Sequence, residues 1–229
     1  TVANAAMQNV HFRRAVMFSI DRATMVAQRK GEDLKYNCMI NAYVPGNFVY
    51  LSKEVTVDIN GESVTFPAGT AYGTIRQRQL EADGSTMKTF DEETGLGTGF
   101  DGWYNPEAAN AELATAIEEL AAQGYEISAE NPVYLDIASF TGNDSFKNQD
   151  QALKQSVESV LGGVVIVNIV PCDTQKDWLN ATYYPNTGAE MNFNIGNNGG
   201  WGPDYGDPKS YLDTLLPGGN GMTKSFGLF

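Results

Sequence analysis

Histidine and cysteine are scarce in this chain, which restricts the chemistry it can carry. His11 is the only histidine among 229 residues, so a metal site built from several histidines is excluded and a Ser-His-Asp triad has one possible base. It lies at the start of a helical pattern, and we interpret it as a structural residue rather than a catalytic one. Cys38 and Cys172 lack metal-ligand spacing and cannot define a disulfide framework. They could pair in an exported protein or remain as buried free thiols.

The chain also has few basic residues and no long apolar run. Lys and Arg number 15 against 28 Asp and Glu, which gives a net charge of −13. This balance argues against a nucleic-acid backbone or an anionic membrane surface as a partner, because both repel an acidic protein. It suits a soluble protein that attracts cationic ligands, although acidity can serve solubility alone. No apolar run approaches the ~20 residues of a membrane span, and no signal peptide is recognisable. Because the chain begins at Thr1 and ends in mid-pattern, we expect a piece of a larger protein.

The second half of the chain alternates between helical and strand patterns. With 42% hydrophobic residues, the chain can bury a sizeable core. The expected order is helix 105–124, strand 133–137, helix 145–161, strand 164–170, helix 174–184 and strand 191–195. Such an order predicts an α/β fold with βαβ units and a mostly parallel sheet flanked by helices. The apolar, β-branched run 164–170 is typical of a strand buried on both faces.

The first half of the chain shows a different organisation. Asn9 is a suitable N-cap for one long helix that runs to about Arg29. Two alternating segments between residues 55 and 66 flank Asn60-Gly61, a dipeptide typical of a type I′ hairpin turn. Residues 69–102 are rich in Gly, Thr and Asp, which indicates a long surface excursion.

The most informative motif is the run Gly199-Gly200-Trp201-Gly202-Pro203-Asp204-Tyr205-Gly206-Asp207-Pro208. It follows the expected strand 191–195, and ligands of open α/β sheets bind beyond the carboxyl ends of strands. Asp204 stands between Trp201 and Tyr205, so a carboxylate has an aromatic residue on either side. This arrangement suits a cationic head group such as an α-ammonium, because the rings exclude water around the ion pair. The alternatives are a solvated loop carboxylate and rings that only pack the loop onto the sheet.

The other residues of this run have simpler interpretations. Asp204 and Asp207 could form an acid–base pair, or bind a metal with nearby asparagines, but no EF-hand pattern is present. Asp207 precedes Pro208 at the start of a helical pattern and is better interpreted as a helix cap. The glycines match no phosphate-binding fingerprint, and they free the backbone for close approach of an extended ligand. No nucleophile elbow or C-x-x-C motif occurs, so we predict no enzyme, no catalytic residue, no metal site and no cofactor.

Three segments of the chain resemble a known family. NVHFRRAVMFSIDR, WYNPEAANAELATAIEEL and GGWGPDYGDPKSYLD are similar to segments of the peptide-binding proteins of bacterial oligopeptide ABC importers, the family-5 extracellular solute-binding proteins. The third segment is close to the motif of the Gram-positive lipoprotein members. The resemblance implies the type II periplasmic-binding-protein fold, in which two α/β lobes close on a ligand. Residues 1–229 would then form a single ligand-binding lobe, with 46–102 as a hairpin-bearing insertion.

The resemblance also implies a function and a site. The protein would capture oligopeptides at the extracellular face of the cytoplasmic membrane, as a lipid-anchored monomer that serves the membrane permease of an ABC importer. Asp204 would pair with the α-ammonium of the peptide, between Trp201 and Tyr205, and Gly199 and Gly200 would face its backbone. No nucleic acid would take part, and membrane contact would come only through a lipid anchor missing from this chain. Residues 191–200 contain no basic side chain that could hold the carboxylate of a short peptide. A longer peptide, or one bound in a more open register, is therefore favoured.

Two other functions stay open at this point. Relatives of this fold take sugars, nickel or other small solutes, and aromatic walls would also suit a carbohydrate, whereas the single histidine disfavours nickel. A secreted glycoside hydrolase with Asp204 as one carboxylate would need a second carboxyl group roughly 5–9.5 Å away.

Overall fold

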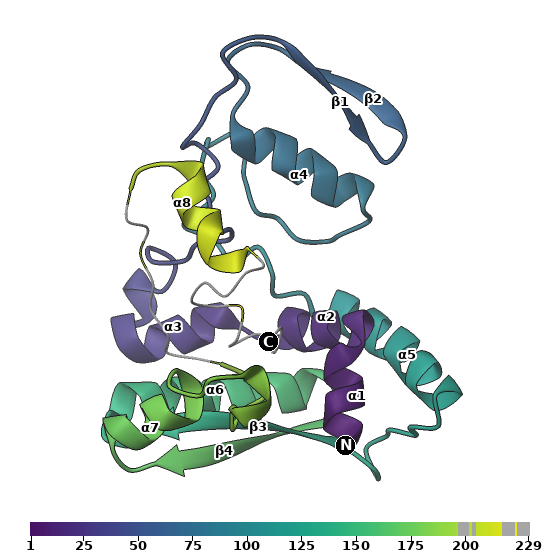
Figure 1. Cartoon of the computed structure of the whole chain (residues 1–229), viewed down its shortest axis with the longest axis vertical. Helices are drawn as coiled ribbons and strands as arrows, with labels where there is room; N and C mark the ends of the chain where they lie inside the picture. Colours follow the sequence, from purple (N-terminus) through teal and green to yellow (C-terminus); the bar gives the residue numbers. More distant parts are fainter. Residues whose placement is uncertain (197–201, 203–204, 217–222, 224–229) are drawn as a thin grey trace.

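The computed structural model describes residues 1–196, 202, 205–216 and 223, and they form an α/β part and an accessory part (Figure 1). The α/β part contains α1 (Val2–Gln8), α2 (Val10–Ser19), α3 (Arg22–Lys30), α5 (Pro106–Ala122), β3 (Val133–Phe140), α6 (Asp144–Val160), β4 (Val165–Cys172) and α7 (Gln175–Thr182). The accessory part, residues 46–102, contains β1 (Val55–Ile59), β2 (Glu62–Phe66) and α4 (Tyr72–Ala82). Near the carboxyl end, α8 (Pro208–Leu212) follows. Three short 3-10 helices complete the set: η1 (Glu32–Leu34), η2 (Gly188–Glu190) and η3 (Asp213–Leu215).

The α/β part is built on a parallel pair of strands. β3 and β4 pair from Val133 opposite Val165 to Phe140 opposite Cys172, and α6 forms the crossover between them. Side-chain oxygens cap the flanking helices, as Asn105 does for α5, Asn143 for α6 and Thr174 for α7. The predicted α/β fold with helices beside a parallel sheet is therefore confirmed. The core lies between the sheet and α2, α5 and α6, and its fully buried side chains include Phe12, Leu120, Leu135, Ile137, Val157, Val165 and Val167.

The second face of this sheet is covered over only part of its length. α7 packs against the carboxyl-terminal end of that face, where the Trp178 indole N–H donates to the Ala138 carbonyl at 3.1 Å. Towards the other end, Tyr134 of β3 is 55% exposed; in β4, Asn168 is exposed, and so is Val170, which lies opposite Ala138. The prediction that run 164–170 is buried on both faces is therefore wrong for the described residues, because the period-2 alternation of β4 buries only one set of its side chains.

The long helix expected from Asn9 to about Arg29 is two helices, α2 and α3. Ile20 has extended backbone angles, and the Asp21 carboxylate caps α3 by accepting from the Thr24 amide. The Ser156 hydroxyl of α6 stabilises the break, since it donates to the Ser19 carbonyl and accepts from the Asp21 amide. The prediction failed because an aspartate inside an apolar helical pattern can start a new helix when a neighbour satisfies the freed backbone groups.

The accessory part confirms one prediction and corrects another. β1 and β2 form the expected antiparallel hairpin, and Asn60 and Gly61 have φ values of 52° and 86°, as a type I′ turn requires. The expected surface excursion 69–102 contains α4, which the sequence pattern did not indicate. This helix has no side-chain cap, and it packs through Gly73, whose missing Cβ leaves room for the Phe90 ring. Its stability therefore comes from a tertiary contact rather than from a local signal.

Among the described residues, no helix is long and apolar enough to cross a membrane. Whether residues 46–102 are an insertion into a single lobe stays a prediction.

Candidate functional site

The residues just before the glycine-rich run lie beside β3. The amides of Asn194 and Ile195 donate to the Asp136 carbonyl at 2.7 and 3.1 Å, and the Asn194 side-chain oxygen accepts from the Asp136 amide at 2.9 Å. Ile195 forms a parallel bridge with Ile137, in the carboxyl-terminal half of β3. The last described contact before the run is therefore at the middle of β3, and residues 197–201 lie outside the described residues.

This segment is not the strand that the sequence predicts for residues 191–195. Within these residues only the bridge at Ile195 forms, and Met191, Asn192 and Phe193 pair with no strand. The physical reason is that the Asn194 side-chain oxygen, rather than a backbone carbonyl, accepts from the Asp136 amide, so that no second bridge forms within residues 191–195. Alternation alone could not reveal this substitution.

Gly206 and Tyr211, towards the carboxyl end of the chain, lie against the accessory part. The Tyr211 ring lies edge-on to Phe48 with centroids 5.5 Å apart, and a Cβ on Gly206 would lie 3.8 Å from the same ring. Asp207 caps α8 by accepting from the Lys209 amide at 2.7 Å, which confirms its interpretation as a cap. The described residues on the two sides of the glycine-rich run, Ile195 and Tyr211, therefore contact different parts of the molecule.

Only one of the five predicted site residues can be placed. Gly199, Gly200, Trp201 and Asp204 lie outside the described residues. Tyr205 is 75% exposed, so its ring is open to solvent and available to a ligand. Its predicted role as an aromatic wall stays a prediction.

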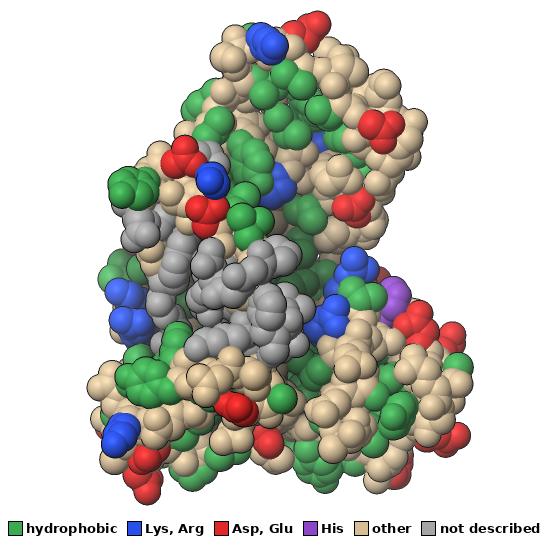
Figure 2. All heavy atoms as spheres, in the orientation of Figure 1, with side chains coloured by type: hydrophobic (Ala, Val, Ile, Leu, Met, Phe, Trp, Pro, Cys, Tyr) green, Lys and Arg blue, Asp and Glu red, His purple; other side chains and the backbone are tan. Residues whose placement is uncertain are grey.

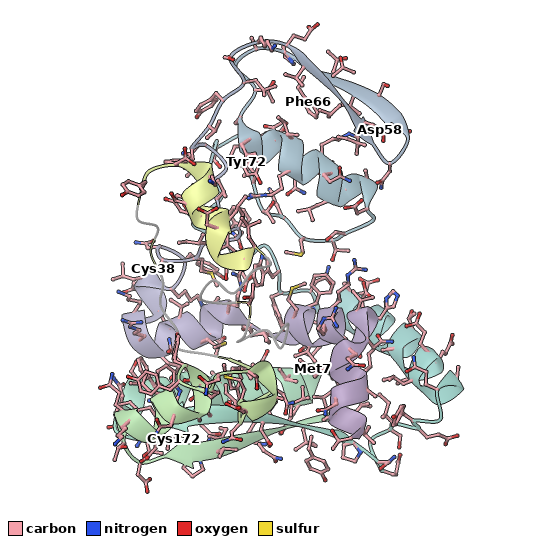
Figure 3. The ribbon with its side chains drawn as sticks, in the orientation of Figure 1. Met7, Cys38, Asp58, Phe66, Tyr72 and Cys172 are labelled. Carbon is pink, nitrogen blue, oxygen red and sulfur yellow. The ribbon has the colours of Figure 1, made fainter. Side chains whose placement is uncertain are left out.

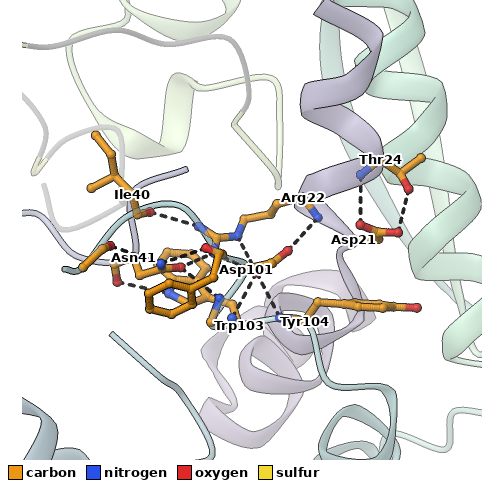
Figure 4. A network of polar contacts seen from close by, with 11 residues as sticks. Asp21, Arg22, Thr24, Ile40, Asn41, Asp101, Trp103 and Tyr104 are labelled. Carbon is orange, nitrogen blue, oxygen red and sulfur yellow. Dashed lines mark hydrogen bonds and ion pairs between the residues drawn. The ribbon is translucent and has the colours of Figure 1, made fainter. Parts of the chain in front are cut away.

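A buried polar network joins α3 to both ends of the accessory part, and no sequence pattern indicated it (Figure 4). The Arg22 guanidinium donates to Asp101 Oδ1 through Nη2 at 2.7 Å and Nε at 3.1 Å, and to Asn41 Oδ1 at 2.5 Å. It also stacks 4.2 Å from the centroid of the Trp103 ring. Asp101 in turn accepts from the backbone amides of Arg22, Trp103 and Tyr104.

This network fixes the position of the accessory part. Asn41 donates to the carbonyls of Gly97 and Phe100, so residues on both sides of the accessory part meet at one arginine. The Arg22 and Asp101 side chains are only 19% and 9% exposed, which means that they depend on each other for solvation. They are 79 positions apart, too far for spacing in the sequence to relate them.

His11 contacts two carboxylates of α5. Its Nδ1 lies 2.5 Å from Glu112 Oε2 and its Nε2 lies 3.7 Å from Glu119 Oε1, which ties α2 to α5. Arg14 Nη1 lies 3.7 Å from Glu112 Oε1, so this arginine also has a carboxylate partner on α5. Figure 2 shows the purple His11 side chain on the surface between basic and acidic groups.

Both cysteines are free thiols. Cys172 is buried, and burial raises the pKa of its thiol, with Asp177 and Asp173 adding to the effect. Cys38 is exposed, so the alternative of two buried thiols is wrong for this residue (Figure 3). In the part of the chain that the structure describes, no group of three or more His, Cys, Asp or Glu side chains is arranged to hold a metal ion.

Asp91 provides a test of local electrostatics. Its carboxylate accepts from Lys88 Nζ at 2.6 Å and from the Thr94 amide at 3.0 Å, and these bonds, the Lys88 bond above all, lower its pKa from 3.8 to about 2. A folded pKa below the ordinary value means that the contribution to stability is present above about pH 4 and lost as the pH falls through about 2. In Lys88→Met, we expect the NMR titration midpoint of Asp91 to rise towards 3.8. The midpoint of Asp144, whose pKa is lowered by Lys147, should not move, and an unchanged Asp91 midpoint would contradict the assigned cause.

Comparison with known proteins identifies the group to which this chain is related. It is 34% identical over 224 residues to the oligopeptide-binding protein SarA of Streptococcus gordonii and 30% identical over 221 residues to AmiA of Streptococcus pneumoniae. Each match covers 96% of this chain, and the chain spans about 30% of the length of these curated relatives.

Solved structures give a weaker likeness. The substrate-binding domain of an oligopeptide ABC transporter from Bacillus anthracis matches 93% of this chain at 19% identity, with a TM-score of 0.47. A Haemophilus influenzae OppA complex with the peptide RPPGFSPFR matches 96% at 15% identity, also with a TM-score of 0.47. In each case the match covers 30% of the solved chain.

The family model gives the decisive result. The model described as "Bacterial extracellular solute-binding proteins, family 5 Middle" matches residues 1–223, which is nearly the whole chain. The chain therefore belongs to the family-5 bacterial extracellular solute-binding proteins.

Proposed function

We propose that this chain is part of an extracellular protein that captures oligopeptides for uptake by an ABC importer. The observation that carries the proposal is family membership over residues 1–223, together with relatives named as oligopeptide-binding proteins that match 96% of the chain. Because the chain spans about 30% of those relatives, the activity belongs to the whole protein. The relatives are binding proteins, and we propose that this protein also acts by binding, without catalysis.

The proposed ligand site is the glycine-rich run. Asp204 receives the α-ammonium of the peptide, Trp201 and Tyr205 exclude water around that ion pair, and Gly199 and Gly200 let the peptide backbone approach closely. Two observations on described residues support this placement. Asn194 leads the chain into the run beside the carboxyl-terminal half of β3, and the Tyr205 ring is exposed.

The proposed partners follow from the same function. A membrane permease of an ABC importer receives the peptide, and the binding protein acts as a monomer held by a lipid anchor at the extracellular face of the cytoplasmic membrane. Peptide side chains enter hydrated pockets, so that main-chain contacts and the amino terminus supply most of the affinity.

Calorimetric titration of the intact protein tests this function. One titration uses a mixed pool of short peptides, and a matched titration uses the same pool after N-acetylation. We expect binding of the free pool and loss of most binding after acetylation, because acetylation removes the charge that Asp204 pairs with. Equal binding of both pools would keep peptide capture and remove the role of Asp204. Binding of neither pool would overturn the proposed function and favour a sugar or another small solute.

A further inference from the structure

The accessory part contains a cavity that the proposed function does not use. It has a volume of about 650 Å³ and opens between β2, one face of α4 and segment 85–92. The α4 residues that line it, Thr74, Gln77, Arg78 and Glu81, follow the i, i+3, i+4, i+7 spacing of a single helix face. Such a volume lies within the range of about 300–1,000 Å³ that ligand sites occupy.

The wall of this cavity combines an apolar base with a rim of mixed charge. Phe66 and Phe90 are 7% and 3% exposed, and Val64 and Met87 are half-buried beside them. Figure 2 shows hydrophobic side chains gathered over the hairpin and α4. Cations and anions both occur at the rim, and Lys88 is already paired with Asp91 at 2.6 Å. The mixed charges at the rim give no preference for an ion of one sign, and the half-buried Val64 and Met87 leave apolar surface for an uncharged group.

The hairpin places this cavity on the side of β2. Val64 and Phe66 of β2 line it, whereas β1, which is fully described, contributes no lining residue. In Figure 3, Phe66 lies between the hairpin and α4. An additional strand beside β2 would therefore lie over the opening, with its side chains on the same face as those of Val64 and Phe66.

The outer edge of β2 has hydrogen-bonding groups to offer such a strand. Because Asn60-Gly61 is a two-residue turn, Ile59 and Glu62 form a hydrogen-bonded pair, and so do Val57 and Val64. The intervening residues Ser63 and Thr65 direct their backbone N–H and C=O groups away from β1, and both residues are exposed. Within the described ranges, no strand pairs with this edge.

We propose that an extended peptide from outside this chain binds here as a third strand, beside β2. Its backbone pairs with Ser63 and Thr65, and its alternate apolar side chains enter the 650 Å³ cavity between β2 and α4. The peptide is recognised by its main chain and by apolar side chains at every second position. The site needs no α-ammonium and does not involve Asp204, so it is independent of the site proposed above.

A peptide with both termini blocked isolates this site from the glycine-rich run. The probe is an acetylated and amidated five-residue peptide with valine at its second and fourth positions and threonine elsewhere, labelled for fluorescence anisotropy and titrated into the full-length protein. Thr65→Pro removes the outward N–H of β2 without removing a bond to β1, because proline is tolerated at such an edge position. Thr56→Pro is the matched control, since Thr56 is the cross-strand partner of Thr65 and its outward N–H lies on the opposite edge.

We expect Thr65→Pro to weaken probe binding about tenfold, the equivalent of one main-chain hydrogen bond, and Thr56→Pro to change it less than about twofold. A probe that is N-methylated at its central residue should bind about tenfold more weakly to the unchanged protein, which tests the backbone pairing without altering the fold. No binding of the blocked probe, equal losses in the two proline variants, or full binding of the N-methylated probe would overturn the proposal. These probe-binding measurements do not depend on Asp204, so a failure of peptide capture at Asp204 would not change their expected outcome.

Discussion

Replacing Asp204 with alanine is expected to weaken binding of peptides that have a free amino terminus by about 2–5 kcal/mol, or roughly 30- to 5,000-fold in Kd. The reason is that the bound α-ammonium would lose its only opposite charge in the proposed site, between the aromatic walls, where water cannot compensate. Calorimetry on the intact protein with a single free-amino peptide measures this directly. Asp204→Asn keeps the shape and should lose most of the same affinity, because it removes only the charge.

Asp207→Asn is the matched control for this experiment. It removes a negative charge three positions away, and its amide oxygen can still accept the Lys209 amide hydrogen bond that caps α8. We expect a change in Kd of less than about threefold, since a nearby exposed charge contributes little. If Asp204→Ala binds the peptide as tightly as the unchanged protein, the assignment of Asp204 is wrong. If Asp207→Asn loses as much as Asp204→Ala, the general negative potential, rather than one carboxylate, attracts the ligand.

The second large effect is expected at Arg22. Arg22→Met removes the partner of the Asp101 carboxylate and of the Asn41 side-chain oxygen, and both residues are largely buried. A buried charge that loses its partner destabilises a protein by about 3–5 kcal/mol. We therefore expect the local opening free energy around residues 101–104 to fall by about that amount.

Hydrogen exchange of three amides provides the measurement. The amides of Gly102, Trp103 and Tyr104 donate to Asn41 or Asp101, so they report on the network itself. Arg29→Met is the matched control, because Arg29 lies in the last turn of the same helix and is exposed. That variant should change the exchange free energies by less than about 0.5 kcal/mol. Unchanged exchange in Arg22→Met would mean that the accessory part is held by other contacts.

The local signals of this sequence determine much of its architecture. Asn60-Gly61 predicts the hairpin, because positive φ at two adjacent residues is a property of the dipeptide itself. Asn105 predicts the start of α5, since a cap and the amides that it satisfies lie within three residues of each other. Asp207 acts as a cap for the same reason. Hydrophobic periodicity then predicts the order of helices and strands from residue 105 to about residue 184, and with it the parallel β3–β4 pair.

Other features depend on residues that are distant in the sequence. α4 carries no cap and is stabilised by the approach of Phe90 to Gly73, so its pattern alone looked irregular. The break between α2 and α3 persists because Ser156, 135 residues after Asp21, satisfies the freed backbone groups. The segment 191–195, expected to be a strand, forms a single bridge because the Asn194 side chain bonds to Asp136, 58 residues away.

For the candidate site too, some features follow from the sequence alone and others only from the tertiary structure. The residue types around Asp204, and the family to which they point, come from the sequence alone, because an acid between two aromatic residues on a glycine-rich run is a local pattern. Tertiary structure determines what the described residues on the two sides of that run contact, with Asn194 at β3 and Tyr211 at Phe48. It also determines the Arg22 network and the cavity beside β2, since each joins segments that only the folded chain brings together. Caps and turns are satisfied within a few residues, whereas buried ion pairs and cavities form only after the loop-closure entropy of long segments has been overcome.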